Sequence, residues 1–159
     1  MRNKIIGFAV AIAMSVGLIE TLEGVEYKPY KDIAGIWTVC SGVTGADVIP
    51  GKIYTERECK ILNEKHSKLA RDTVDHFVKV EIPDSMRAAL YSHTYHTGSG
   101  AFSRSTILKE ANKGNLYKAC EHLYDWVYYT DPKTKKKKFS KGLWNRKNHE
   151  FQVCVRDLK

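Results

Sequence analysis

The stretch from residue 23 to residue 45 reads EGVEYKPYKDIAGIWTVCSGVTG. It begins at the end of a helix-forming segment, residues 18 to 24 (LIETLEG), in which Gly24 is the expected stop. Its aromatic residues, β-branched residues and glycines predict short strands and turns. The segments after it predict helices. We therefore expect an α+β fold, with a small sheet-containing part near residues 25 to 50 followed by a larger helical lobe.

Several helical segments are expected after the strand-rich stretch. Thr55 and Glu58 match a capping box, which predicts a helix that starts there and runs to about Phe77. The polar segment 128–141 predicts an exposed hairpin or loop. The other expected helices cover residues 84–97 (ended by Gly98-Ser99-Gly100), 103–113, 115–126 and 142–157.

Length and charge narrow the classes of protein. A chain of 159 residues, 43% apolar and 28% charged, is long enough for one globular domain with a real core. The formal net charge is +8, partly concentrated at Lys133 and at residues 135 to 138. Such a surface favours an anionic partner, namely nucleic acid, a membrane face or a cell wall, unless the lysine run is only a solvated loop. No nucleic-acid module accompanies the charge, so we expect no nucleic-acid binding.

The four cysteines are Cys40, Cys59, Cys120 and Cys154. None stands in a C-x-x-C or another tight zinc spacing, so we expect no structural metal site. An even count after an export-like N-terminus suits two disulfides in an oxidising compartment, whereas a cytosolic chain would carry four buried thiols. Spacing alone does not choose among the three possible connectivities.

Residues 5 to 19, IIGFAVAIAMSVGLI, carry no charge and follow Arg2 and Lys4. The run is shorter than the roughly 20 apolar residues that span a bilayer. It is also weakly hydrophobic, because every odd position from Gly7 to Gly17 is Gly, Ala or Ser. The two basic residues predict an N-terminus inside the cell and a domain outside it.

Four interpretations of this segment stay open on the residues alone. It could be a signal peptide cleaved near Ala11-Ile12-Ala13, although that would leave a short apolar core. It could be a permanent anchor, or a weak anchor that inserts and later leaves the membrane. It could also be a buried helix of a soluble protein. The alternation of small and large residues could suggest a strand, but as a helix the segment has Gly7, Ala11 and Ser15 on one small-residue face at four-residue spacing.

Three residues of the opening stretch suit glycoside hydrolysis. That reaction needs one group to protonate the leaving oxygen and another to position or replace a water. Glu23 closes an apolar helix, where partial burial could keep it protonated. Asp32 follows in a polar turn, where it would stay ionised, and the Thr38 hydroxyl could orient a water. These spacings alone occur in many proteins and do not identify an enzyme.

The order of residue types around Glu23 is more specific, because it resembles the phage-type lysozymes, the endolysins of lambdoid phages. The resemblance covers almost the whole chain. It rests on Glu23-Gly24, Tyr30-Lys31-Asp32, Gly35, Trp37-Thr38, Gly42 and Thr44-Gly45, then Tyr54-Thr55, Glu58-Cys59, Ala89-Leu90-Tyr91-Ser92, Tyr95, Gly98, Gly100-Ala101-Phe102 and Ser105-Thr106, and finally Gly142-Leu143, Arg146, Glu150 and Cys154.

The resemblance implies a lysozyme-like fold and cleavage of the β-1,4 bond between N-acetylmuramic acid and N-acetylglucosamine in peptidoglycan. It makes Glu23 the general acid, with Asp32 and Thr38 holding the attacking water, in an inverting reaction. It also implies sugar contacts from His96 and Arg146. A monomer without a cofactor or metal is expected.

The chain departs from the family pattern at four positions. Val43 stands where His is frequent, and His66 stands where a carboxylate partner for that His is expected. Both members of one salt bridge are therefore changed, which concerns stability more than catalysis. His96 replaces an amide side chain and could alter sugar contacts or lie at the surface. Lys147 replaces a second Arg.

Two other classes of function are weaker. His93 and His96 form an H-x-x-H pair, but a zinc amidase needs a third ligand and an open position. A non-catalytic cationic protein that binds membranes or cell walls could keep a lysozyme-like fold. The joint presence of Glu23, Asp32 and Thr38 argues against that loss of function.

The apolar segment and the acid are neighbours, since Glu23 would lie only about 6 Å beyond Ile19 along a helix. We therefore expect an anchor of residues 1–19 and a catalytic domain of residues 20–159. Residues 5–19 would hold the chain in the host inner membrane, facing the periplasm, until it is released in active form. This resembles signal-anchor-release endolysins, although the anchor here contains no cysteine for thiol exchange. Pairing within each lobe favours the disulfides Cys40–Cys59 and Cys120–Cys154.

Overall fold

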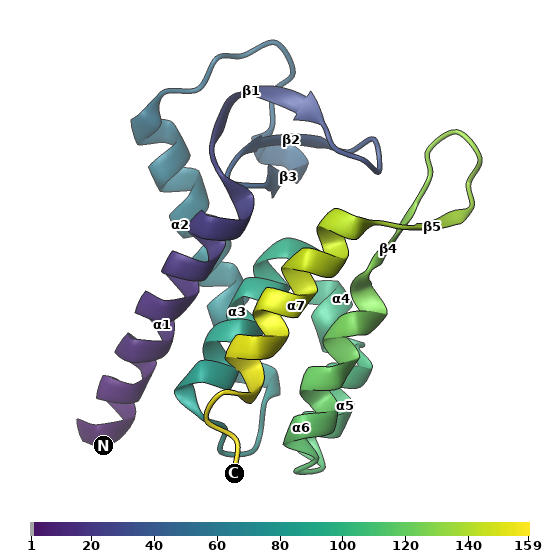
Figure 1. Cartoon of the computed structure of the whole chain (residues 1–159). Helices are drawn as coiled ribbons and strands as arrows, with labels where there is room; N and C mark the ends of the chain where they lie inside the picture. The colour runs from purple at the N-terminus through teal and green to yellow at the C-terminus, as the bar shows by residue number, and fades with distance from the viewer. Residues whose placement is uncertain (1) are drawn as a thin grey trace.

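The computed structural model describes the backbone of residues 2–159 and the side chains from Phe8 onward, and it has two lobes (Figure 1). The helices are α1 (Arg2–Glu23), α2 (Glu56–Phe77), α3 (Asp84–Thr97), α4 (Ser99–Ser103), α5 (Thr106–Asn112), α6 (Leu116–Glu121) and α7 (Lys141–Val155), with 3₁₀ turns η1 (Gly45–Asp47) and η2 (His122–Trp126). The strands are β1 (Glu26–Lys31), β2 (Trp37–Cys40), β3 (Val43–Thr44), β4 (Tyr128–Thr130) and β5 (Lys137–Phe139).

The first helix, α1, is continuous from the N-terminal segment to Glu23, and it lies along α3 (Figure 1). Ala11, Ser15 and Ile19 are 0%, 1% and 6% exposed, so the four-residue spacing read from the sequence is the face that packs on the helical lobe. Gly24 ends the helix with a φ of 64°, a conformation that favours glycine. The basic flank and Gly7 lie outside the described side chains. Among the described residues, no helix is both long enough and apolar enough to cross a membrane.

The small lobe is an antiparallel sheet in the order β1-β2-β3, which confirms the strands expected after Gly24. Thr38 pairs with Tyr30 on one side and with Thr44 on the other. Its apolar face forms a cluster of Val39, Cys40, Val43, Val48, Tyr54 and Cys59. The Cys40–Cys59 disulfide ties the sheet to α2, in agreement with the pairing expected within this lobe.

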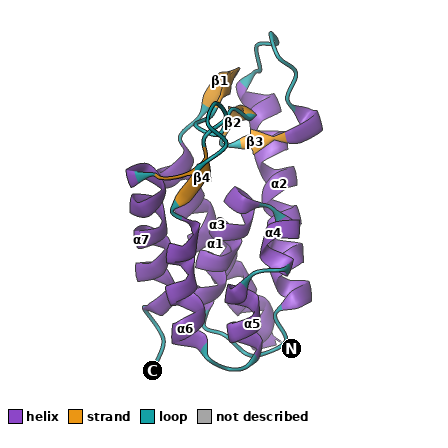
Figure 2. Ribbon diagram, turned by 90° about the vertical axis from the view of Figure 1, so that its right-hand side faces the viewer, coloured by secondary structure: helices purple, strands orange, loops and turns teal. Residues whose placement is uncertain are grey.

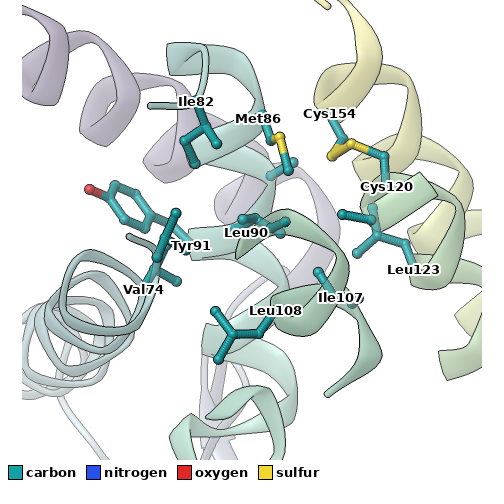
Figure 3. Packing of buried hydrophobic residues seen from close by; sticks show 14 of the residues in the cluster. Val74, Ile82, Met86, Leu90, Tyr91, Ile107, Leu108, Cys120, Leu123 and Cys154 are labelled. Carbon is teal, nitrogen blue, oxygen red and sulfur yellow. A yellow bond between two sulfur atoms is a disulfide. The ribbon is translucent and has the colours of Figure 1, made fainter. Parts of the chain in front are cut away.

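The helical lobe is built around α3, from which nine residues are buried. Its core joins α3 to α2, α5 and η2 through Val74, Ile82, Met86, Leu90, Tyr91, Ile107, Leu108 and Leu123 (Figure 3). The Cys120–Cys154 disulfide connects α6 to α7 at the edge of this core, again as expected from pairing within a lobe. The sheet stands at one end of the helices and the two termini at the other (Figure 2).

Most boundaries expected from the sequence are confirmed, including the capping box of Thr55 and Glu58 at the start of α2. Three differ. Residues 99–103 form α4 where a glycine-rich break was expected. Helix α5 starts only at Thr106, because the Ser105 side chain caps it by accepting from Leu108 N. The segment expected as one helix to residue 126 changes to a 3₁₀ turn after Glu121. Strands β4 and β5 form the hairpin that the polar segment suggested.

Candidate active site

Glu23 is the last residue of α1, and its carboxyl group contacts both the turn between β2 and β3, at Gly42, and Arg146 of α7. Its side chain is 13% exposed, and Nη1 of Arg146 donates a hydrogen bond to Oε1. Both partners are largely withdrawn from water, since the Arg146 side chain is 8% exposed. The helix end and the ion pair therefore hold the carboxyl group in one place. The two partners, Glu23 and Arg146, are 123 positions apart in the sequence.

Gly42 lets the sheet approach this carboxyl group closely. Its φ is 77°, and a Cβ atom added to it would stand 2.7 Å from Oε2 of Glu23 and 2.9 Å from the carboxyl carbon. A side chain at this position would therefore displace the acid or the turn between β2 and β3. The resemblance quoted Gly42 as part of a motif, but only the structure gives its physical reason.

Asp32 sits in the turn between β1 and β2, and its side chain builds that turn. Oδ1 accepts from the backbone N–H groups of Ala34 and Ile36, both at 2.9 Å. In the part of the chain that the structure describes, Oδ2 takes no hydrogen bond. One oxygen of Asp32 is therefore committed to structure, and the other is available to a ligand.

Thr38 and Tyr30 are paired residues of β2 and β1, the two strands that the Asp32 turn connects. Thr38 is 4% exposed and its hydroxyl donates to the carbonyl of Ile36 at 3.0 Å, which leaves the oxygen lone pairs to accept a further bond. Burial and the negative charges of Glu23, Asp32 and Glu26 raise the pKa of Tyr30. The two carboxyl groups thus act electrostatically on one side chain, which indicates that the sheet brings them to one site.

Helix α3 contributes Tyr95 and His96 to the region around Glu23. Tyr95 donates its hydroxyl to the carbonyl of Ser41 at 2.5 Å, and burial together with the charge of Glu23 raises its pKa. His96 lies on the exposed side of α3. The surrounding protein, followed by the charges of Arg146 and Lys147, lowers the pKa of His96 well below its ordinary value.

Arg146 is the residue for which the sequence predicted a sugar contact. It is 7% exposed, and its guanidinium group bonds Glu23, Glu150 and the carbonyl of Ser92. In this structure its hydrogen bonds therefore go to protein groups and hold the Glu23 carboxyl group, and the sugar contact stays a prediction.

A cluster of buried polar side chains next to Arg146 was not predicted from the sequence. Lys147, Glu150 and His93 are all 0% exposed and contact one another. The spacing of Arg146 and Lys147 to Glu150, four and three positions along one helix, was a signal that the sequence did contain. His93 is thus enclosed in the core, and within the described residues no group of three or more His, Cys, Asp and Glu side chains could hold a metal ion.

The structure shows what Val43 and His66, the two departures from the family pattern, contact. Val43 is 1% exposed and packs in the sheet cluster. His66 forms its ion pair with Asp47 instead, with Nε2 3.0 Å from Oδ2, and Lys65 bonds the same carboxylate. The link between α2 and the sheet lobe is therefore kept, with different residues.

The two lobes also touch away from Glu23. The Asp32 turn meets the β4–β5 hairpin, because a Cβ atom on Gly35 would stand 3.3 Å from Cβ of Pro132. The hairpin carries the lysine run, and Asp131 organises it by accepting from Lys138 and from the backbone of Lys133 and Thr134.

Comparison with known sequences gives one consistent result. A model of the phage lysozyme family matches residues 20–150. The SAR-endolysin of Bacteriophage PS119 is 42% identical over 163 residues, covering 98% of this chain and 94% of that protein. The SAR-endolysin of Enterobacteria phage P21 is 44% identical over 134 residues, covering 84% of this chain and 78% of that protein.

Solved structures agree. The endolysin from Escherichia coli O157:H7 phage FAHEc1 is similar with a TM-score of 0.78 at 28% identity, covering 91% of this chain and 92% of that chain. The active form of the P1 phage endolysin Lyz gives 0.74 at 26% identity, covering 92% and 85%. The secreted inactive form of the P1 protein gives only 0.55 at 24% identity, covering 72% and 78%.

Proposed function

The chain belongs to the phage lysozyme family and is a glycoside hydrolase that degrades peptidoglycan, and from this premise we propose which of its residues act and how the cell controls them. Glu23 is the general acid for the β-1,4 bond between N-acetylmuramic acid and N-acetylglucosamine. Asp32 and Thr38 hold the attacking water. The observation that carries this proposal is the Glu23 carboxyl group, which is enclosed between Arg146 and Gly42 and faces the sheet that bears the other two residues.

The acid is well suited to deliver one proton at a fixed place. A general acid has to lie within hydrogen-bond reach of the leaving oxygen while the bond breaks. Arg146 and the end of α1 fix the Oε1 side of Glu23, and the backbone of Gly42 packs against the Oε2 side. Such fixed geometry lowers the entropic cost of reaching the transition state.

The water site needs acceptors that are themselves held in place. Oδ1 of Asp32 is fixed by two backbone N–H groups, which orients Oδ2 toward a ligand. Thr38 donates to Ile36 O and can accept from the water, so the two residues together can hold and polarise it. Asp32 then takes up the proton as the water adds to the sugar carbon.

The test compares Glu23→Gln with wild type in a turbidity assay on outer-membrane-permeabilised cells, and measures reducing ends released from purified peptidoglycan. Glutamine keeps the shape and an acceptor for Arg146 but cannot deliver the proton, so we expect turnover to fall at least about 100-fold with an unchanged thermal transition. Glu20→Gln is the matched control, an exposed glutamate on the same helix. Clearing by Glu23→Gln at the wild-type rate would show that the assignment is wrong.

The same assay separates a second class, a cationic wall-binding protein without catalysis. Such a protein would disperse or bind cells but release no new reducing ends. The net charge of +8 and the lysine hairpin support binding to an anionic wall, but they do not require a carboxyl acid at position 23.

We further propose that residues 1–19 are a releasable anchor in the host inner membrane and residues 20–159 the catalytic domain, which works in the periplasm as a monomer after release. The relatives are named SAR-endolysins, which supports an anchor of this type. Ala11, Ser15 and Ile19 pack on the helical lobe in the described state. The same residues cannot face lipid and α3 at once. In the anchored chain, α1 therefore cannot pack on α3 and place Glu23 at the site.

The greater similarity to the active than to the inactive form of the P1 endolysin supports the view that this structure corresponds to the released state. Gly17 allows a sharp test, because a Cβ atom added there meets nothing within 4 Å. Gly17→Leu makes the segment more hydrophobic, so it should strengthen membrane retention without disturbing the folded enzyme. Gly17→Ser should leave both the retention and the fold unchanged. Fractionation before and after adding an uncoupler measures this. Equal release of both variants with full activity in the membrane fraction would contradict the proposal.

A further inference from the structure

Lys147 is a fully buried cation behind the acid. It lies on α7 with 0% of its side chain exposed, where an unpaired ammonium group would be strongly disfavoured. Its Nζ donates to Oε2 of Glu150 at 2.6 Å and lies 3.0 Å from Nδ1 of His93. Both partners are also fully buried, so the group has no contact with solvent.

A continuous set of contacts leads from Lys147 to the catalytic acid. The second oxygen of Glu150 accepts from Nε of Arg146 at 3.1 Å and from the Ser92 hydroxyl at 2.8 Å. Arg146 then donates from Nη1 to Glu23. Glu150 is therefore shared by two cations, and only one of them reaches Glu23.

The charged and titratable groups that face Lys147 come from three helices. Glu150 and Arg146 lie on its own helix, His93 and His96 on α3, and Glu23 at the end of α1. Burial, followed by the charge of Lys147, lowers the pKa of His93 well below its ordinary value, so His93 is neutral and its Nδ1 can accept. Trp126 closes the far side of the His93 ring with an edge contact.

The Lys147 ammonium group loses its proton at a lower pH than an ordinary lysine. Burial lowers the pKa of Lys147 to about 8, with Arg146 acting in the same direction, while Glu150 and Glu23 oppose the shift. The charge of Glu23 acts on Lys147, so a change of charge at either residue is felt at the other.

We propose that Lys147 is a positioning residue for the hydrolytic reaction, because it holds Glu150, through it Arg146, and so sets both the place of the Glu23 carboxyl group and the pH range in which this group keeps its proton. Without the ammonium group, Glu150 has only Arg146 as a cationic partner and draws it away from Glu23. This inference rests on the proposed role of Glu23 as the acid.

The test uses two variants of opposite charge effect, Lys147→Met and Glu150→Gln, with reducing-end release from purified peptidoglycan measured between about pH 5 and pH 9. Lys147→Met removes a positive charge, which favours the protonated form of Glu23, so the alkaline limb of kcat should move up by about 0.5 to 1 pH unit. Glu150→Gln removes a negative charge and should move the same limb down. In both variants kcat should fall about 10-fold or more with KM little changed, because the acid is displaced and the sugar contacts are not.

Two further variants test whether the loss of rate comes from a displaced Glu23 carboxyl group or from a less stable fold. Lys147→Arg keeps the charge and should recover most of the rate without raising the alkaline limb, and Lys109→Met, an exposed lysine on α5, should match wild type. Glu23→Gln reports separately on the acid. If Glu23→Gln is inactive while Lys147→Met and Glu150→Gln fold and shift the limb in the same direction or not at all, this inference fails and the proposed function stands. If Glu23→Gln is active, both fail.

Discussion

The carboxyl group of Glu23 rests against the backbone of Gly42, with Oε2 2.7 Å from the point where a Cβ atom at position 42 would stand. Gly42→Ala should therefore displace the acid and reduce lytic activity by about 100-fold. The positive φ adds a strain of about 1 to 3 kcal/mol.

Gly51→Ala is the matched control for this prediction. Gly51 has a similar φ of 84° with nothing within 4 Å of the added Cβ. Thermal unfolding should show a comparable loss of stability in both variants, while only Gly42→Ala loses its activity. Equal activity in the two variants would mean that the contact with Glu23 does not matter.

Asp32→Asn separates the two tasks of Asp32. The amide oxygen can still accept from Ala34 and Ile36, so the turn and the thermal transition should be kept. The negative charge that we propose to take the proton from water is lost, and the rate should fall by about 100-fold or more. Reducing-end assays with calorimetry measure both effects. Asp32→Ala, which loses the turn bonds too, should lose stability as well as rate, and a fully active Asp32→Asn would exclude Asp32 as the base.

The contact between Gly35 and Pro132 allows the two lobes to be linked covalently. The distance of 3.3 Å to Cβ of Pro132 is close to the Cβ separation in disulfides, so Gly35→Cys with Pro132→Cys should cross-link on oxidation. If a glycan strand enters by separating these two turns, the oxidised form should degrade peptidoglycan at least about 10-fold more slowly.

Mild reduction should restore this activity, because all four native cysteines are at most 2% exposed and react more slowly than the new bond. Each single cysteine variant controls for the strain at Gly35 and for the loss of Pro132. A cross-linked enzyme that works at the rate of the reduced form would show that the contact does not limit access.

The ion pair of Asp47 predicts a dependence of stability on acid pH. Hydrogen bonds from Lys65 and then His66 lower the pKa of Asp47 below its ordinary value of 3.8. A carboxyl group with a lowered pKa stabilises the fold above its unfolded pKa and loses this effect as pH falls through its folded pKa. Asp47→Asn should therefore be less stable than wild type at pH 5 to 7, by up to about 1 kcal/mol because the group is partly exposed.

The difference should shrink below about pH 4 and vanish once Asp47 is protonated in both states. Thermal melts of both proteins between pH 2 and pH 7 measure it. Asp72→Asn, whose partner Lys68 and carboxylate are both largely exposed, should show a smaller effect. A constant difference at all pH values would contradict the linkage.

Local chemistry determined much of this protein before any tertiary contact was known. The strands after Gly24, the capping box at Thr55 and the helix over residues 84–97 all follow from side-chain periodicity and from backbone groups that need a partner nearby. That helix ends at Gly98, as expected, but the short helix α4 that follows was not predicted, because its two serines and a glycine carry no helical periodicity and it is held by packing on α2 and α3.

The candidate site divides in the same way. Glu23, Asp32 and Thr38 lie in one continuous stretch of sequence, so their order alone carried a recognisable pattern. The sequence also contained the small-residue spacing of α1, but whether that face meets lipid or α3 depends on the surroundings of the helix.

Only the tertiary structure decided which residues surround the Glu23 carboxyl group. Arg146, which is 123 positions away, and Gly42 contact it from other elements, and Lys147 is joined to Arg146 through Glu150. Burial places Arg146 against Glu23 and Glu150, and it encloses Lys147 with Glu150 and His93. Such roles depend on which charges are removed from water together, and that is a property of the packed lobes and not of the order of residues along the chain.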